Sequence, residues 1–174
     1  FNITGTGRGS GGDNNTGVFV VHADSTITSG GGDVIVTGQG GGTGDSASNY
    51  GVYLLEGGEI TSGGTGRVTI TGTGGASSGA TNYGVYVVGT NASITSGGGD
   101  VSVTGQGGGT GASEGNLGVL LNSGGQISAG SNGTVTVTGT GGASSGASNY
   151  GVHVHSADST ITSGGGDVSV TGVG

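Results

Sequence analysis

The histidine side chains are the first candidates for chemistry in this chain. His153 and His155 alternate with Val154, so on a strand both would point to one side and could together hold a metal ion weakly. The simpler interpretation is that they are surface residues that replace the Tyr and Val of equivalent segments. His22 has no matching partner. Because histidine occurs in only two of these segments, no nucleophile is paired with a base and an orienting acid.

The acidic side chains are the second group of candidates. Glu56 and Glu59 flank a Gly-Gly turn, but no second acidic segment lies beside them to supply the paired carboxylates of polysaccharide cleavage. The run Ser-Gly-Gly-Gly-Asp is similar to calcium-binding β-rolls, yet the nine-residue period of those repeats is missing. One Asp in every second repeat does not supply the several oxygens that calcium needs. We expect no enzyme, no catalytic residue and no cofactor, with calcium as the alternative.

The composition excludes further classes of protein. The 174 residues include 50 Gly and no Pro, Cys, Met or Trp, only 7% are charged, and the formal net charge is −8. Without Cys there are no disulfides or thiolate metal sites, and two Arg without any Lys offer little to nucleic acid. The longest apolar run, residues 18–21, is too short to cross a bilayer, so we expect no membrane insertion. No Gly-rich string has the form of a phosphate-binding loop.

Three series of apolar residues recur at steps of 33 or 34 residues, which indicates an internal repeat. The first follows Gly, at Val18, Val52, Val85, Val119 and Val152; the second is Ile27, Ile60, Ile94, Ile127 and Ile161; the third precedes Thr-Gly, at Val36, Ile70, Val103, Val137 and Val170. Residues 34–100 and 101–167 form two copies of a 67-residue unit. We attribute the alternating step to the first turn, which is longer where Asp24, Asn91 or Asp158 stands and shorter at Gly57-Gly58 and Gly124-Gly125.

Each repeat contains three short strands and too few apolar side chains to close a core alone. Stacked repeats can share a core, because each strand then pairs with its counterparts about 4.8 Å above and below. Gly and β-branched residues disfavour helices throughout. The sequence therefore predicts an all-β parallel β-helix (β-solenoid) over residues 1–174, with about five coils of 33 or 34 residues and three strands per coil. We expect it to be one segment of a longer array or a fibre.

Two polar columns follow from this stacking. An Asn three residues before each Gly-Val strand would form a hydrogen-bonded ladder along the rod, or would instead satisfy its own turn backbone; these residues are Asn15, Asn49, Asn82, Asn116 and Asn149. A charged column precedes the third strand, with Asp33, Arg67, Asp100, Thr134 and Asp167. Its carboxylates would lie two coils apart, about 9.6 Å, so we predict exposed ion pairs with Arg67 between Asp33 and Asp100.

Two outward columns are candidates for binding. The first is an aromatic stripe, Phe19, Tyr53, Tyr86, Leu120 and His153, beside a second column of Thr16, Tyr50, Tyr83, Leu117 and Tyr150. It could bind glycans, or its side chains could stack between coils for stability. The other is a hydroxyl stripe, Thr69, Thr71, Ser102, Thr104, Thr136, Thr138, Ser169 and Thr171, a pattern typical of ice-binding solenoids that Ile35 interrupts.

The pattern VTGQGGGTG…NYGVYV…ITSGGGD resembles the long repeat regions of large bacterial surface exoproteins, such as filamentous-haemagglutinin-like adhesins and autotransporter passenger domains. The resemblance covers the whole chain and rests on composition and repeat style. It implies a right-handed β-helix, secretion, and an adhesive or scaffolding role. No functional residue can be transferred from it.

We therefore expect an extracellular structural rod or filament of a bacterial surface or matrix protein, acting as an adhesin stalk or as a building block of a fibre. The alternatives are an adhesin that binds glycans or surfaces through the aromatic stripe, and an ice-binding solenoid. Because open coils expose strand edges, we expect self-association end to end or side by side, with surface glycans as the other candidate partner.

Overall fold

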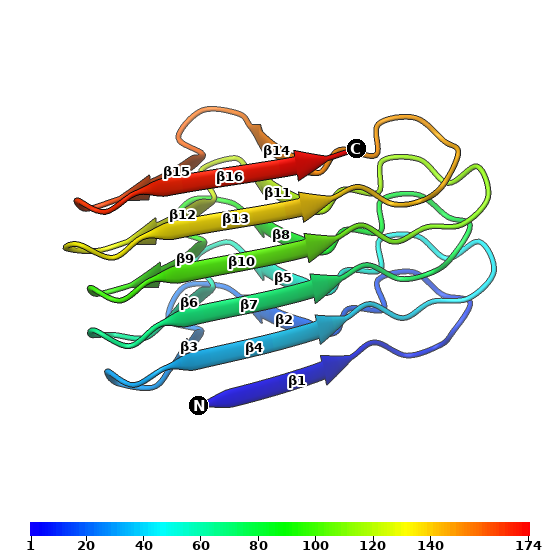
Figure 1. Cartoon of the computed structure of the whole chain (residues 1–174). Helices are drawn as coiled ribbons and strands as arrows, with labels where there is room; N and C mark the ends of the chain where they lie inside the picture. The colour runs from blue at the N-terminus through cyan, green and yellow to red at the C-terminus, as the bar shows by residue number, and fades with distance from the viewer.

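The structure, a computed structural model that describes all 174 residues, is an all-β parallel β-solenoid of about five coils (Figure 1). Sheet A contains β1 (Asn2–Thr6), β4 (Val34–Gln39), β7 (Val68–Thr73), β10 (Val101–Gln106), β13 (Val135–Thr140) and β16 (Val168–Val173). Sheet B contains β2 (Val18–Val21), β5 (Val52–Leu55), β8 (Val85–Val88), β11 (Val119–Asn122) and β14 (Val152–His155). Sheet C contains β3 (Thr26–Thr28), β6 (Glu59–Thr61), β9 (Ser93–Ser96), β12 (Gln126–Ala129) and β15 (Thr160–Ser163).

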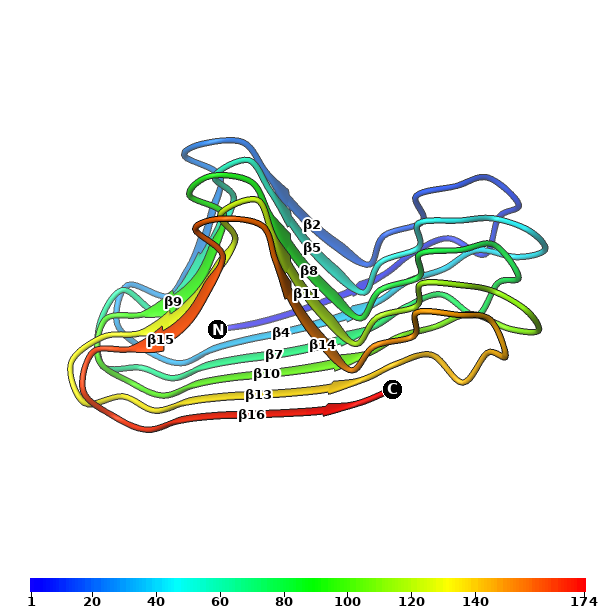
Figure 2. The same ribbon diagram turned by 90° about the horizontal axis from the view of Figure 1, so that it is seen from above.

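Every coil takes one strand from each sheet, in the order A, B, C. All pairs are parallel and pair equivalent residues of successive repeats, for example Val52 with Val85 and Ile60 with Ile94. Seen from above, the chain runs counterclockwise while it rises towards the viewer, so the solenoid is right-handed (Figure 2). The predicted fold, number of coils and three strands per coil are thus confirmed.

The three sheets enclose a triangular apolar core. Along each strand, buried and outward residues alternate, as in β4, where Val34 and Val36 are fully buried while Ile35 is 42% exposed. The buried side chains include members of the three predicted series and further apolar residues such as Val34, Leu54 and Leu121, and they form one continuous cluster of 21 residues. Each coil thus contributes only a few side chains, and the core exists because the coils stack.

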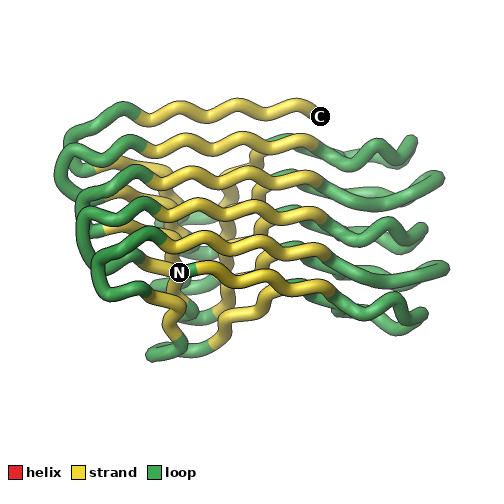
Figure 3. The backbone as a smooth tube through the Cα atoms, turned by 60° about the horizontal axis from the view of Figure 1, so that its bottom comes forward, coloured by secondary structure: helices red, strands yellow, loops and turns green.

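A glycine contact closes the corner between sheets A and B. In five successive sheet A strands the Gly after the Thr faces inward, where an added Cβ would lie 2.0–2.2 Å from a carbonyl oxygen at the start of the sheet B strand. At Gly105 that oxygen belongs to Gly118. The two backbones meet with no side chain between them, and the chain between sheets A and B therefore passes outside the core as an arm (Figures 2 and 3).

The turns between sheets B and C have the residues that their backbone needs. Asp24, Asn91 and Asp158 have φ angles of 71°, 65° and 64°, and Gly57 and Gly124 have φ angles of 90° and 92°. The left-handed region favours these residue types, as the sequence predicts.

The attribution of the alternating step to this turn is wrong, because the turn between sheets C and A compensates for its length. The alternation arises in the arm, which covers residues 40–51 and 107–118 in one kind of coil and residues 74–84 and 141–151, one residue fewer, in the other.

Candidate functional site

The arm has a polar interior built around the five predicted asparagines. The Nδ2 of each of the first four donates to the Oδ1 of the Asn one coil above, at distances of 2.9, 2.8, 3.1 and 3.1 Å from Asn15 to Asn149. The same Oδ1 also accepts the backbone N–H of the Asn below. At most positions Nδ2 bonds the carbonyl three residues earlier as well, as from Asn82 to Gly79 at 2.7 Å. The ladder and the local turn bond, which the sequence predicted as alternatives, therefore coexist.

Serines that the sequence analysis missed complete this interior. Ser46 and Ser113 lie three residues before their Asn, whereas Ser77 and Ser144 lie five residues before theirs. Their hydroxyls bond to Asn amides, including Asn49 Nδ2 to Ser77 Oγ at 3.1 Å and Asn116 Nδ2 to Ser144 Oγ at 3.1 Å. The result is that no buried side-chain nitrogen or oxygen lacks a partner. The signal in the sequence was the recurrence of each serine after 67 residues.

The aromatic stripe forms two stacks in the first three coils, at the junction between the arm and sheet B. Phe19, Tyr53 and Tyr86 stack with ring centroids 4.8 and 5.1 Å apart and interplanar angles of 11° and 5°. Tyr50 and Tyr83 form the second stack, at 5.2 Å and 24°, with their edges against the first. The ring faces of Tyr53 therefore lie against neighbouring rings, and a sugar ring cannot stack on them.

The tyrosine stacks end at the fourth coil, where the two columns carry leucines. Leu120 and Leu117 are buried, at 7% and 5% exposure, and above them Tyr150 lies edge-on to His153 at 5.3 Å. The neighbouring His155 has its ring centroid 5.3 Å from that of His153. The stripe predicted as one surface is thus a tyrosine cluster and a Tyr-His pair, separated by two leucines.

Burial changes the acidity of the phenols in the cluster. Desolvation, reinforced by neighbouring phenols, raises the pKa of both Tyr53 and Tyr83 to about 12. The pKa of Tyr50 is raised by the same desolvation, which hydrogen bonds to Ser48 and Thr81 partly oppose. All three phenols are therefore neutral near pH 7.

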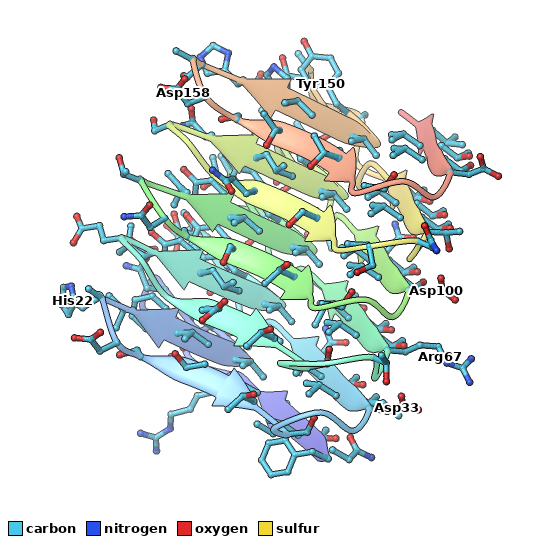
Figure 4. The ribbon with its side chains drawn as sticks, turned by 90° about the vertical axis from the view of Figure 1, so that its left-hand side faces the viewer. His22, Asp33, Arg67, Asp100, Tyr150 and Asp158 are labelled. Carbon is cyan, nitrogen blue, oxygen red and sulfur yellow. The ribbon has the colours of Figure 1, made fainter.

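The ion pairs predicted for the charged column are not formed. The structure contains a single contact within 4.0 Å between a basic side chain and a carboxylate, from His22 Nδ1 to Glu56 Oε2 at 3.4 Å. Asp33 Oδ1 instead accepts the backbone N–H of Arg67 at 2.8 Å, and Asp100 Oδ1 accepts the N–H of Thr134 at 2.9 Å. The Arg67 side chain extends away from both carboxylates (Figure 4). The carboxylate can form this charge-assisted hydrogen bond to the next coil without immobilising a long side chain, whereas an ion pair with Arg67 would require that.

Asp100 makes a pH-dependent contribution to stability. The backbone N–H of Thr134, and then its hydroxyl, hold the pKa of Asp100 below its ordinary value. A depressed folded-state pKa stabilises the fold above the unfolded-state pKa, and this contribution is lost as the pH falls through the folded-state value. We expect acidification below about pH 4 to reduce the free energy of unfolding of the wild type more than that of Asp100→Asn, measured by urea denaturation.

Asp167 is the matched control for this titration. It occupies the same column in the last coil, where no residue above it donates to its carboxylate. The Asp167→Asn variant should therefore keep the pH dependence of the wild type. Equal pH dependence in the wild type and Asp100→Asn would show that the bond to Thr134 contributes nothing.

The histidines have ordinary surface positions. His155 is exposed and His153 is half-buried. His22, for which the sequence offered no partner, lies against Glu56 one coil above, and both side chains are well exposed, so the contact is weak. No group of three or more His, Asp or Glu side chains is arranged to hold a metal ion.

The outer face of sheet A carries an unbroken threonine column. The register pairs Thr4, Thr37, Thr71, Thr104, Thr138 and Thr171 across all six strands. The neighbouring column is mixed and holds Asn2, Ile35, Thr69, Ser102, Thr136 and Ser169. None of these residues is charged, so the sheet presents a regular hydroxyl face without charge.

One shallow, open depression lies at the turns between sheets B and C. Among its lining residues are Asp24, Glu59, Asn91 and Gln126, and Ala23 is the only hydrophobic one. It brings two carboxyl groups to the surface without a basic side chain or a nucleophile beside them. This arrangement gives no basis for assigning a reaction.

The structure has no helix with the length and hydropathy required to span a bilayer. Comparisons with protein-family models, curated proteins and solved structures returned no match. The geometry described above therefore supports a parallel β-solenoid of about five coils, and the resemblance to surface exoproteins rests on the repeat pattern alone.

Proposed function

We propose that this chain is a structural rod or filament segment of an extracellular bacterial surface or matrix protein. The observation that carries the proposal is the in-register continuity of all three sheets together with the Asn ladder. Every coil is joined to the next by backbone hydrogen bonds in three sheets and by an Asn–Asn side-chain hydrogen bond in the arm. Such a stack grows in length without changing its cross-section, which is what a spacer needs.

The chemistry of the surface agrees with a passive role. The aromatic rings stack on one another, the acidic groups of the charged column bond backbone N–H groups, and the polar interior of the arm is fully satisfied. With only two Arg and no Lys, trypsin-like proteases have few sites. An extended rod outside the cell benefits both from satisfied polar and aromatic groups and from few protease sites.

The length of the array is the variable that tests a spacer. Inserting ten further copies of residues 34–100 should lengthen the protein by about 96 Å, because each unit adds two coils. Electron microscopy of the displayed filament measures that length, and an attachment assay measures adhesion. We expect reach to increase with copy number while substitutions on the outer faces leave attachment unchanged.

If the chain is an adhesin, attachment should depend on the side chains of the aromatic stripe and not on the number of copies. The double variant Tyr53→Ser, Tyr86→Ser would then abolish attachment while circular dichroism shows an intact fold. That result would replace the spacer role with a binding role for the aromatic stripe. The matched control is Thr28→Ser on the outer side of sheet C.

Ice binding is the second candidate, favoured by the threonine column. Hydroxyls repeat about every 4.8 Å along the rod and, in the strands where both columns carry Ser or Thr, about every 6.6 Å along a strand. The uninterrupted run of six Thr is longer than the sequence stripe suggested. Ile35 still interrupts the neighbouring column.

Thermal hysteresis tests this second candidate. If sheet A binds ice, Thr104→Lys at the centre of the face should remove most of the activity, because a charged, flexible side chain disrupts the array. Thr162→Lys on the outer side of sheet C should not. Absence of thermal hysteresis in the wild-type protein would end the ice-binding candidate.

A further inference from the structure

The side chains that are easiest to oxidise are gathered in one place. The chain contains no Cys, Met or Trp, so its five tyrosines are its most readily oxidised side chains. Four of them, Tyr50, Tyr53, Tyr83 and Tyr86, form the cluster between the arm and sheet B. The fifth, Tyr150, is separated from them by the Leu117 coil and contacts His153 instead.

Within the cluster, Tyr53 and Tyr86 have the closest alignment of two phenol rings. The residues are direct partners in the β5–β8 register, and their ring centroids lie 5.1 Å apart with an interplanar angle of 5°. Because the two residues are equivalent in the register and their rings are nearly parallel, the face of each ring, with the ortho carbons that flank its hydroxyl, lies toward the other ring. The strands hold this arrangement, so it does not depend on a chance encounter of flexible side chains.

We propose that Tyr53 and Tyr86 are an oxidative cross-linking site, which a one-electron oxidant such as a haem peroxidase acting with hydrogen peroxide converts to dityrosine. Each phenol loses one electron and one proton, and the two radicals join through a carbon–carbon bond between ortho carbons. The hydrogen on each of these carbons then moves to the phenolic oxygen and restores the ring. The two electrons and two protons reduce one hydrogen peroxide to two water molecules, so the chain loses two hydrogen atoms.

Accessibility distinguishes this pair from the Tyr50–Tyr83 pair, in which Tyr83 is half-buried but Tyr50 is buried. Tyr50 is only 9% exposed, whereas Tyr53 and Tyr86 are half-buried on the outward side of sheet B. Their exposed edges can meet an oxidant while their faces remain stacked. The Tyr50–Tyr83 rings are also less parallel, at 24°.

A cross-link here would join the second and third coils covalently. Separation of those coils under load would then require breaking a carbon–carbon bond in addition to the strand bonds. This added resistance to separation would strengthen a structural rod. The coupling itself does not depend on the proposed function, because it requires only the ring geometry.

The two arginines allow a direct test. Trypsin cuts the unfolded chain after Arg8 and Arg67, which separates residues 9–67, with Tyr50 and Tyr53, from residues 68–174, with Tyr83, Tyr86 and Tyr150. The folded protein is oxidised in dilute solution with horseradish peroxidase and hydrogen peroxide, then unfolded and digested. We expect residues 9–67 and 68–174 to remain joined, with dityrosine fluorescence and the loss of two hydrogen atoms by mass spectrometry.

Single Tyr→Phe variants assign the pair. Phe19 already occupies the same stack, so a ring without a hydroxyl fits. Tyr53→Phe and Tyr86→Phe should each abolish the joined product, whereas Tyr50→Phe, Tyr83→Phe and Tyr150→Phe should retain it. Complete separation of the two fragments after oxidation of the wild type, dityrosine found only between different molecules, or an unchanged product in Tyr53→Phe would each overturn the proposal.

Discussion

Replacing Asn82 by Ala should destabilise the solenoid by about 2–4 kcal/mol. Asn82 is fully buried at the centre of the ladder. Its Oδ1 is the only acceptor of the Asn49 backbone N–H, at 3.3 Å, and it also accepts Asn49 Nδ2 at 2.8 Å. The truncation leaves a buried backbone donor without a partner, which costs far more than an ordinary hydrogen bond contributes. Urea denaturation gives the change, and hydrogen exchange at the Asn49 amide locates it.

Two further variants separate this effect from simple loss of volume. Asn15→Ala lies at the first position, where no lower coil donates to its Oδ1, so about 1 kcal/mol or less is expected. Asn82→Asp has the shape of Asn, and its folded-state pKa should be raised by burial and by the neighbouring oxygens. Its stability should therefore be highest below the pKa of the unfolded chain and fall as the pH rises. Equal effects of Asn82→Ala and Asn15→Ala would contradict this account of the ladder.

The parts of the fold that depend on strand periodicity could be predicted from the sequence. Val, Ile and Leu recur in three phases, and stacking in register is the one arrangement that buries all three. The columns of Asn82 and Thr104 followed directly, because residues one repeat apart must then lie above one another. These predictions needed no knowledge of any loop conformation.

The parts that depend on the path of the arm and turns could not be predicted in this way. Asp100 bonds the N–H of Thr134 only because the turn places that donor within reach. Ser48 and Thr81, which precede ladder asparagines, have left-handed φ angles of 60° and 62°, which neither residue type favours. The ladder bonds on the following residue hold the backbone in that conformation. The function of the surfaces could not be predicted from the repeat pattern either, because such a pattern constrains the shape of the protein much more than it constrains its ligands.

The second substitution with a large expected effect on stability is at the Gly of the Thr-Gly pair in the sheet A strands. Gly105→Ala should destabilise the protein by more than about 3 kcal/mol. The new Cβ would lie 2.1 Å from Gly118 O and 2.6 Å from Val119 Cγ2, and the first of these is backbone that cannot rotate away. Sheets A and B would have to separate at the corner that closes the core. The matched control is Gly172→Ala, which has the same phase in β16 but meets nothing closer than the Val152 nitrogen at 3.1 Å. We expect that variant to lie within about 0.5 kcal/mol of the wild type, and similar losses in the two variants would show that the close glycine contact does not hold the corner together.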